Sequence, residues 1–342
     1  MNTSAPHAAT PPARPRRAAL RALLRSTAAA GLLATLGSGS ALAQDAWPAK
    51  PIRFIVGFPA GGTTDIMARV VGTPLQKALG QPIVVDNRPG ASGNIAASET
   101  IRAAADGYTF MVAPISVQTA NPSLYKPALN PERDLRPVVS MGYAQLYLVA
   151  KKGLPVANVG ELLALARSKP GGLSYGSGGP GTQMHLVGEL FKQQAGVDVV
   201  HVPYKGAAPA LQDVLAGQID YYFDPASGFG HIREGRAKLL AVSGTQRSPF
   251  FPDAPTLTEA GVKGVELGNW FGLFAPARTP PAVMQRMAQE VAKALQLPEV
   301  KSRYTELGVE PVAQDGAAFG KTIASETTVL KQLIQARGIV LD

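Results

Sequence analysis

Short apolar runs alternate with segments of helical periodicity along most of the chain, starting at residue 52. The apolar runs are rich in β-branched and aromatic residues and are bounded by Gly, Pro and Asn, so they predict strands at 52–56, 83–85, 108–112, 173–175, 197–202 and 219–223. Apolar residues at spacings of three and four predict helices from 65 onward and at 95–104, 184–194, 208–216, 281–294 and 316–336. This alternation is typical of an α/β fold with parallel strands.

The helix that begins near residue 65 carries its own start and stop signals. Thr64 or Asp65 is the expected N-cap, because a short side-chain oxygen can accept a hydrogen bond from an unpaired backbone N–H. Gly72 and Pro74 weaken the helix and predict a kink or an early end there.

The order of strand, glycine-rich loop, helix, strand and turn occurs twice, about 120 residues apart, which predicts two lobes of similar construction. The chain would cross between lobes near 146–149 and 270–273, and neither crossing has a Gly/Ser- or Pro-rich linker, so ordered hinge strands are expected. We therefore predict a discontinuous first domain, 44–146 plus 270–342, and a second domain, 147–269. The C-terminal helices should pack back on the first.

The first 43 residues predict a removable export signal. Five arginines form a basic region without acids, an apolar stretch follows at 28–36, and Ala41-Leu42-Ala43 has the small-x-small pattern of a signal peptidase site. The alternative, a membrane anchor, is disfavoured because the stretch is too short for about 30 Å of hydrocarbon. We expect cleavage after Ala43 and a periplasmic protein, exported by the Sec route or, given Arg16-Arg17, by the twin-arginine route.

Charge and cysteine content exclude several classes of site. Without the five signal arginines the formal charge falls from +9 to +4, which lacks the dense basic stripes of nucleic-acid binding. The chain has no cysteine, so disulfides, thiolate metal sites, cysteine nucleophiles and a lipidated cysteine are excluded. The histidines that follow the signal, His185, His201 and His231, lack metal-ligand spacing. We expect neither a metal nor a cofactor.

Two glycine-rich loops, 57–64 and 176–182, each follow a predicted strand and open a predicted helix. The first turn of a helix carries unpaired N–H groups and a partial positive charge, and glycine lets the backbone approach a ligand closely. The expected ligand of such a loop is therefore an anion. Neither loop holds a lysine or arginine, which favours recognition by backbone amides, with hydroxyls from Thr63, Thr64, Ser177 and Thr182. The residues alone leave open that both loops are only tight strand-to-helix turns.

Enzymatic interpretations find less support. Residues 176–181 match G-x-G-x-x-G, but the next strand ends in 201–204 without the acid that would hold a ribose, which argues against dinucleotide binding. Ser177 lacks the preceding glycine of a G-x-S-x-G elbow. Asp224 either caps the turn after its strand or binds a ligand amine or hydroxyl. Tyr204 lies at the carboxyl end of a strand, where open α/β sheets bind ligands.

Longer motifs follow one another through the chain, among them Phe-Pro-Ala-Gly-Gly-Thr-Thr-Asp at 58–65, Asp-Asn-Arg-Pro-Gly-Ala-Ser-Gly-Asn at 86–94 and His-Val-Pro-Tyr-Lys-Gly at 201–206. Others lie at 50–56, 106–109, 121–125, 223–224, 247–249 and 270–273. This combination resembles the Bug family, the extracytoplasmic solute receptors of tripartite tricarboxylate transporters. The resemblance implies a periplasmic-binding-protein-like Venus flytrap of two α/β domains joined by crossing hinge strands.

The resemblance also implies a carboxylate held between the lobes. The first lobe would contribute Phe58, Pro59, Ala60, Gly61, Gly62, Thr63, Thr64 and Asp65, with Ala113, Ser116 and Gln118 after the third strand. The second lobe would contribute Ser177, Gly178, Gly179, Gly181 and Thr182, with His185, Tyr204 and Asp224 beside the cleft. Many relatives have an additional glycine where Thr63 stands, so Thr63 is expected to narrow the pocket.

The function implied is capture of a small organic acid by lobe closure and its delivery to membrane transporter subunits, with a sensor partner as a variant. We expect a monomer that binds no nucleic acid and has no catalytic residues. The rival from another class is a periplasmic enzyme acting on a carboxylic acid, for which Asp224 with His185 is the only titratable pair to nominate. A pure interaction protein, without an enclosed polar cleft, is the third alternative.

Overall fold

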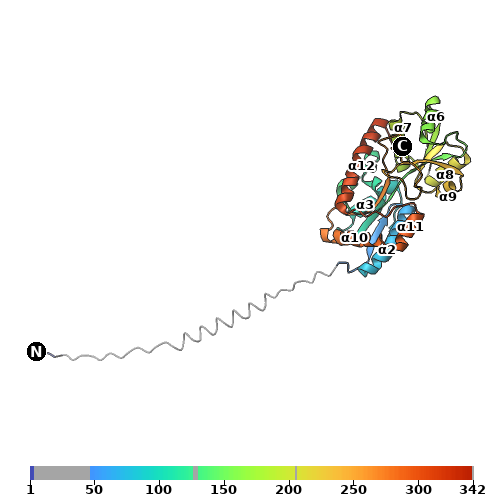
Figure 1. Ribbon diagram of the computed structural model, residues 1–342. Coiled ribbons are helices and arrows are strands. Elements are labelled where there is room, and N and C mark those ends of the chain that lie inside the picture. Colours follow the sequence, from blue (N-terminus) through green and yellow to red (C-terminus); the bar gives the residue numbers. More distant parts are fainter. Residues whose placement is uncertain (4–46, 126–129, 205, 341–342) are drawn as a thin grey trace. The chain divides into compact units, whose positions relative to one another are not determined.

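The computed structural model describes residues 1–3, 47–125, 130–204 and 206–340 (Figure 1). The chain divides into two compact units, Met1–Trp47 and Pro48–Asp342, and the account below concerns the second. The predicted signal peptide, 1–43, lies outside the described residues apart from its first three. Within the described ranges, no helix combines the length and the apolar character needed to cross a bilayer.

The first sheet has five strands in the order β2-β1-β3-β10-β4. Its strands are β1 Ile52–Val56, β2 Ile83–Asn87, β3 Thr109–Pro114, β4 Leu135–Ala144 and β10 Asn269–Pro276. The first three are parallel, and β10 runs antiparallel to both β3 and β4. The sheet packs with α2 Thr63–Leu79, α3 Asn94–Arg102 and α10 Pro281–Ala294, and α11 Pro298–Glu306 packs on α2.

The second sheet has the order β7-β6-β8-β5-β9. Its strands are β5 Tyr147–Lys151, β6 Ser174–Ser177, β7 Val200–Pro203, β8 Tyr221–Asp224 and β9 Ala237–Val242. It packs with α7 Gln183–Ala195 and α8 Ala207–Ala216, while α6 Val159–Ser168 precedes β6 and α9 Phe229–Arg233 contacts β9. Three parallel strands are again followed by one antiparallel strand, β5, and then by β9, which is antiparallel to β5, so both sheets have the same topology and the α/β prediction is confirmed.

The chain passes between the sheets at two places. It leaves β4 at Ala144 and enters β5 at Tyr147, and it returns between β9 and β10. The two crossing segments bind each other: Ser243 N–H donates to Leu146 O at 2.8 Å, and Leu146 N–H donates to Ser243 Oγ at 3.0 Å. The crossings are ordered strands and turns, as predicted. The domain boundaries at 146 and 270 stay a prediction.

The last helix, α12 Gly316–Arg337, contributes to both hydrophobic cores. Phe319 and Ile323 pack in a cluster with residues of the first sheet, whereas Leu330, Leu333 and Ile334 belong to the cluster around the second sheet. In Figure 1 the red helix α12 runs beside α7, in agreement with their contacts. The sequence predicts that the C-terminal helices pack on the first lobe, but α12 packs on both.

Two expectations for α2 are wrong. The helix continues through Gly72 and Pro74 to Leu79, because Val71, Leu75 and other apolar residues are buried on either side of the proline. Gly72 serves close packing, since a Cβ there would lie 3.3 Å from Ile83 Cγ2. The N-cap is Gly62, without a side-chain cap, instead of Thr64 or Asp65.

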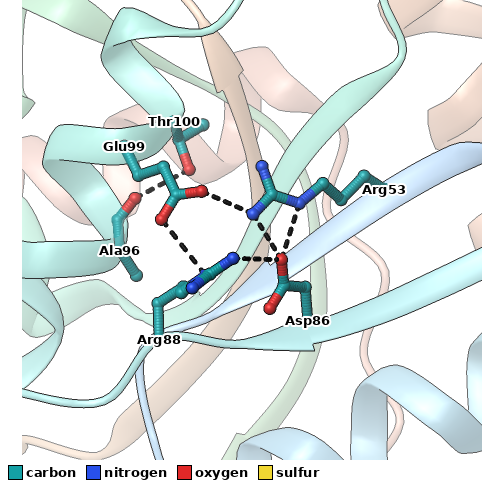
Figure 2. A network of polar contacts seen from close by, with 6 residues as sticks. All are labelled: Arg53, Asp86, Arg88, Ala96, Glu99 and Thr100. Atoms are coloured by element: carbon teal, nitrogen blue, oxygen red, sulfur yellow. Dashed lines mark hydrogen bonds and ion pairs between the residues drawn. The ribbon is translucent and has the colours of Figure 1, made fainter.

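A network of charges ties α3 to the first two strands of the first sheet (Figure 2). Arg53 on β1 donates to Asp86 on β2, with Nε–Oδ2 at 2.9 Å, and to Glu99 on α3. Arg88, which follows β2, bonds the same two carboxylates at 3.1 and 3.4 Å. Partial burial by itself would raise the pKa of Asp86, but Arg53 and Arg88 outweigh it and lower that pKa. The network fixes the chain where it enters the 88–93 turn.

Candidate functional site

The loop 57–62 joins β1 to α2 and is anchored from beneath by Asp65. Its residues 59–62 are exposed, and Gly61 adopts φ +81°. Asp65, 3 % exposed, accepts a hydrogen bond from Gly61 N–H at 2.9 Å and pairs with Arg69 at 2.9 Å. Asn87 completes the support by donating to Asp65 Oδ1 and Phe58 O, both at 3.0 Å. The Asp65 carboxylate thus faces the protein itself.

Burial alone would raise the pKa of Asp65. Hydrogen bonds from Arg69, Gly61 N–H and Asn87 outweigh that effect and hold its pKa below the usual value. The loop therefore rests on a carboxylate that is ionised at neutral pH and already has hydrogen-bond partners.

The beginning of α2 is left open toward solvent. Gly62 is its N-cap, and no side chain accepts a hydrogen bond from the first turn. An uncapped first turn presents backbone N–H groups and the positive end of the helix dipole to whatever lies beyond. This is the geometry that suits an anion.

The loop 177–182 joins β6 to α7 and is more tightly bonded. Thr182 caps α7 by accepting from His185 N–H at 3.4 Å and donates its own hydroxyl to Gly179 O at 2.7 Å. Gly179 N–H donates to Ser177 Oγ at 3.1 Å, and Gly181 N–H donates to His185 Nδ1 at 3.1 Å. Gly179 takes φ +119°, a conformation that requires glycine.

A stack of rings supports this second loop. His185 and His201 lie 4.1 Å apart between centroids at 13°, and Tyr175 stacks on the other side of His201 at 4.8 Å. His201 Nε2 lies 2.7 Å from Ser177 Oγ. Burial lowers the pKa of both imidazoles, that of His201 to about 4 with help from the neighbouring His185, so both are neutral near pH 7. Neither ring offers a counter-charge to a carboxylate.

Other predicted site residues have partners inside the protein. Gln118, 2 % exposed, donates to Pro131 O and Leu135 O at 2.8 and 2.9 Å. Tyr204 donates to Asp213 at 2.6 Å. Ala113 is fully buried and Ser116 is half-buried.

Asp224 is completely buried and accepts hydrogen bonds from Ser227 Oγ and Gly228 N–H, in the manner of a turn cap. Burial raises the pKa of its carboxyl. The pair nominated for catalysis, Asp224 with His185, is thus engaged with separate partners, because His185 accepts from Gly181. Among the described residues no group of three or more His, Asp or Glu side chains could hold a metal ion.

Sequence reasoning missed the contributions of His201 and Asn87. The register of β6 and β7 sets Tyr175 beside His201 and Ser177 beside Pro203, so His201 lies on the strand next to the loop serine. That neighbour could have been found by pairing the two predicted strands in parallel. Asn87 ends β2, beside Val56 at the end of β1, and could have been found in the same way.

The comparisons with known proteins agree with this architecture. Residues 67–339 match the model of the tripartite tricarboxylate transporter family receptor. Protein BugT of Bordetella pertussis is 37% identical over 284 residues, covering 82% of this chain and 87% of BugT.

Solved structures show the same likeness. Rpa4515 of R. palustris, solved with adipate, is 34% identical with a TM-score of 0.76, covering 86% of this chain and all of the other. MatC from Rhodopseudomonas palustris, solved with bound malate, is 31% identical with a TM-score of 0.72, covering 84% of this chain and all of the other. The two sheets are thus the two halves of a periplasmic-binding-protein-like fold, and the chain belongs to the tripartite tricarboxylate transporter receptor family, whose Bug proteins are solute-binding receptors.

Proposed function

We propose that this receptor binds a small organic carboxylate between the loop Phe58–Asp65 and the loop Ser177–Thr182. The observation that carries the proposal is the uncapped N-terminus of α2 behind an exposed glycine loop. The equivalent place in the second sheet holds another glycine loop and helix start. The adipate and malate in two relatives support the same ligand class.

The predicted residues divide into two roles in this proposal. The backbone N–H groups of Ala60, Thr63 and Thr64, with the Thr63 and Thr64 hydroxyls, would contact the carboxylate, because Pro59 has no N–H and those of Gly61 and Gly62 donate to Asp65 and to Pro59 O. From the other loop the carboxylate would be met by Ser177, Gly178, Gly179, Gly181 and Thr182. Asp65 and His185 would hold those loops in shape by accepting from Gly61 and Gly181. Neighbouring segments would be fixed by Gln118, Tyr204 and Asp224, whose hydrogen-bond partners lie outside the two loops. Ala113 and Ser116 would form the wall after β3.

The ligand would favour a closed form by contacting both halves, and that form would dock on membrane transporter subunits or a sensor. We further propose export to the periplasm with removal of residues 1–43, a monomer, and no catalysis. Recovery of the bound acid unchanged after long incubation would agree with a receptor, whereas turnover would favour the enzyme.

A thermal-unfolding screen against organic acids tests the ligand class. A ligand that binds only the folded state adds about 2.7 kcal/mol at a hundred times its Kd. This moves the unfolding midpoint by about 4–5 °C when about 300 residues each contribute about 2.1 cal/mol/K to the unfolding entropy. We expect one acid to shift the midpoint while its amide and alcohol do not. Equal shifts by all three, or none after removal of any copurified acid, would contradict the proposal.

Gly62 offers the matched variant. Its φ of −76° suits any residue, and a Cβ there would lie 3.3 Å from Pro59 O. Gly62→Val should stay folded, with its unfolding midpoint measured beside that of the wild type, and should abolish the ligand-induced shift by covering the helix start. Gly179→Val is a poorer choice, because φ +119° and a Cβ 3.1 Å from Tyr204 O would strain the loop itself. Unchanged affinity in Gly62→Val would contradict a carboxylate at this position.

A further inference from the structure

A second polar cavity lies where the chain crosses between the two sheets. This crossover cavity has a volume of about 430 Å³ and is lined by Tyr143, Gln145, Thr245, Gln246, Arg247, Glu266, Gly268, Trp270, Glu310, Val312 and Glu326. Its walls come from β4, β10, α12 and the segments after β9 and α11. None of the residues predicted to bind the carboxylate lines it, so it is separate from the site proposed above.

Unsatisfied acceptors line the crossover cavity. Gln145 is 3 % exposed and donates its Nε2 to Glu310 at 3.3 Å, which leaves Oε1 buried without a hydrogen-bond partner. Glu326 Oε2 is also buried and unpartnered. A buried acceptor without a donor destabilises the folded protein, so a donor that reaches the cavity would be bound favourably.

The carboxylate of Glu310 is held in place by the backbone. Residues Tyr143 and Glu310 exchange two backbone hydrogen bonds, at 2.8 and 2.9 Å, which fasten the segment before α12 to the edge of β4. Burial raises the pKa of the Glu310 and Glu326 carboxyls, that of Glu326 to about 8. A cation in the cavity would remove that cost of ionisation.

The remaining lining groups restrict the kind of cation. Tyr143 and Trp270 form a half-buried pair with centroids 4.7 Å apart, a surface that suits alkyl groups and cations. Arg247 is paired with Glu259 at 3.0 Å, and Glu266 is exposed and accepts from Thr258. No group of three carboxylates or histidines in the described chain is arranged for a metal ion.

We propose that the crossover cavity binds a small organic ammonium ion, with its N–H donors on Glu310, Glu326 and Gln145 Oε1 and its alkyl part against Tyr143 and Trp270. A primary ammonium has three donors for these three acceptors, whereas a metal ion would need a closer set of oxygens. Because both crossing segments line the cavity, its occupant would contact residues on either side of the crossing.

Isothermal titration with n-butylammonium chloride tests this site, with n-butanol as the neutral control at matched ionic strength. We expect saturable binding of the ammonium ion and none of the alcohol. Glu326→Gln should weaken the affinity at least about tenfold, or 1.4 kcal/mol, and Glu310→Gln should act in the same direction. The matched control is Glu306→Gln, an exposed carboxylate outside the cavity, which should bind as the wild type does.

The pH dependence provides a second readout. Between pH 7 and pH 9 the ammonium stays charged while Glu326 ionises, so the wild-type affinity should rise by up to about tenfold and the rise should vanish in Glu326→Gln. The absence of saturable binding to the wild type would overturn the proposal. So would equal affinities of Glu326→Gln and Glu306→Gln, provided that the unfolding midpoints show both variants folded. Should Glu326→Gln fail to fold, the half-buried Glu310→Gln decides alone.

Discussion

Asp65 illustrates how the polar residues of the candidate site act. Its carboxylate lies beneath the first loop and binds Gly61, Arg69 and Asn87. By holding the loop from inside, it fixes the position of the exposed residues 59–62. The motif at 58–65 therefore encodes the shape of the loop as much as any contact with the solute.

We expect Asp65→Asn to destabilise the protein by about 1–3 kcal/mol at pH 7, because Gly61 N–H and Arg69 lose a buried charged acceptor. The folded-state pKa of Asp65 lies below the unfolded value, so its contribution is present above about pH 4 and is lost as the pH falls further. Urea unfolding of both proteins between pH 3 and 7 should show the two stabilities converging at low pH. A difference that stays constant with pH would contradict this role.

His201 predicts an acid sensitivity of the same sign as that of Asp65, but at higher pH. Its folded-state pKa of about 4 lies below the usual 6.5, so the unfolded chain takes up a proton that the folded one refuses. Folding stability contributed at this position is therefore intact above pH 6.5 and declines as the pH falls toward 4. In His201→Gln the slope of unfolding free energy against pH should be smaller across that interval. A slope equal to that of the wild type would contradict this assignment.

At the scale of elements, α2 tolerates Pro74 because of what it packs against. The proline removes one helical hydrogen bond, yet Met67, Val71 and Leu75 are completely buried against the sheet. Burial of such side chains contributes about 1.5–3 kcal/mol each, which exceeds the cost of a proline in a helix. The burial of α2 against the sheet therefore determines its length.

Pro74→Ala should raise the free energy of unfolding by about 1–3 kcal/mol, because the missing N–H and its bond are restored. Lys77→Ala, at an exposed position of the same helix, should change it by less than about 0.5 kcal/mol. Chemical denaturation of the three proteins measures both. A loss of stability in Pro74→Ala would show that the proline ring packs usefully.

The alternating pattern predicts the parallel strands and most of the helices well, since burial on both faces requires continuous apolar runs. Helix α10 occupies the predicted range 281–294. The pattern fails at the cap of α2, because Asp65 is committed to Gly61 and Arg69 and the helix begins at Gly62 without a side-chain cap. It also fails for contacts between distant segments: nothing in the sequence around Glu310 indicates that it lies beside Gln145.

The candidate site, too, could be predicted from the sequence only in part. Both glycine loops could be located from sequence, because each follows a strand and opens a helix. The orientation of Gln118 and Asp224 could not, since their partners are backbone groups whose positions depend on the folded turns. The sequence motifs locate the two loops, whereas the folded structure determines which groups each side chain contacts.

For the whole molecule, α12 joins the two cores. Phe319 lies in the cluster of the first sheet, Leu330 in that of the second, and Arg337 pairs with Glu189 on α7 at 2.8 Å. Burial alone would raise the pKa of Glu189, but Lys192, Tyr175 and Arg337 bring it to about 2. The helix end is thus fixed to the second half by charge as well as by packing.

Leu330→Ala should cost about 2–5 kcal/mol, because the side chain is fully buried. If α12 couples the two halves, the reduced stability should also be detected at Trp270, which lies on the first sheet. Trp270 fluorescence in a Trp47→Phe background, followed through urea unfolding, should report a lower midpoint that coincides with the midpoint from circular dichroism. Separate transitions would contradict the coupling, and Val329→Ala, at a partly exposed position, is the control.

The position of α12 after both sheets in the sequence has a consequence for the order of folding. A polypeptide is made from its N-terminus, so both sheets are complete in sequence before the side chains that finish their cores exist. Until Phe319, Leu330 and their neighbours arrive, each half would expose apolar surface, which favours late, cooperative completion over independent folding of the halves. Premature termination anywhere before residue 316 would consequently leave two unfinished cores, and such fragments should aggregate or be degraded.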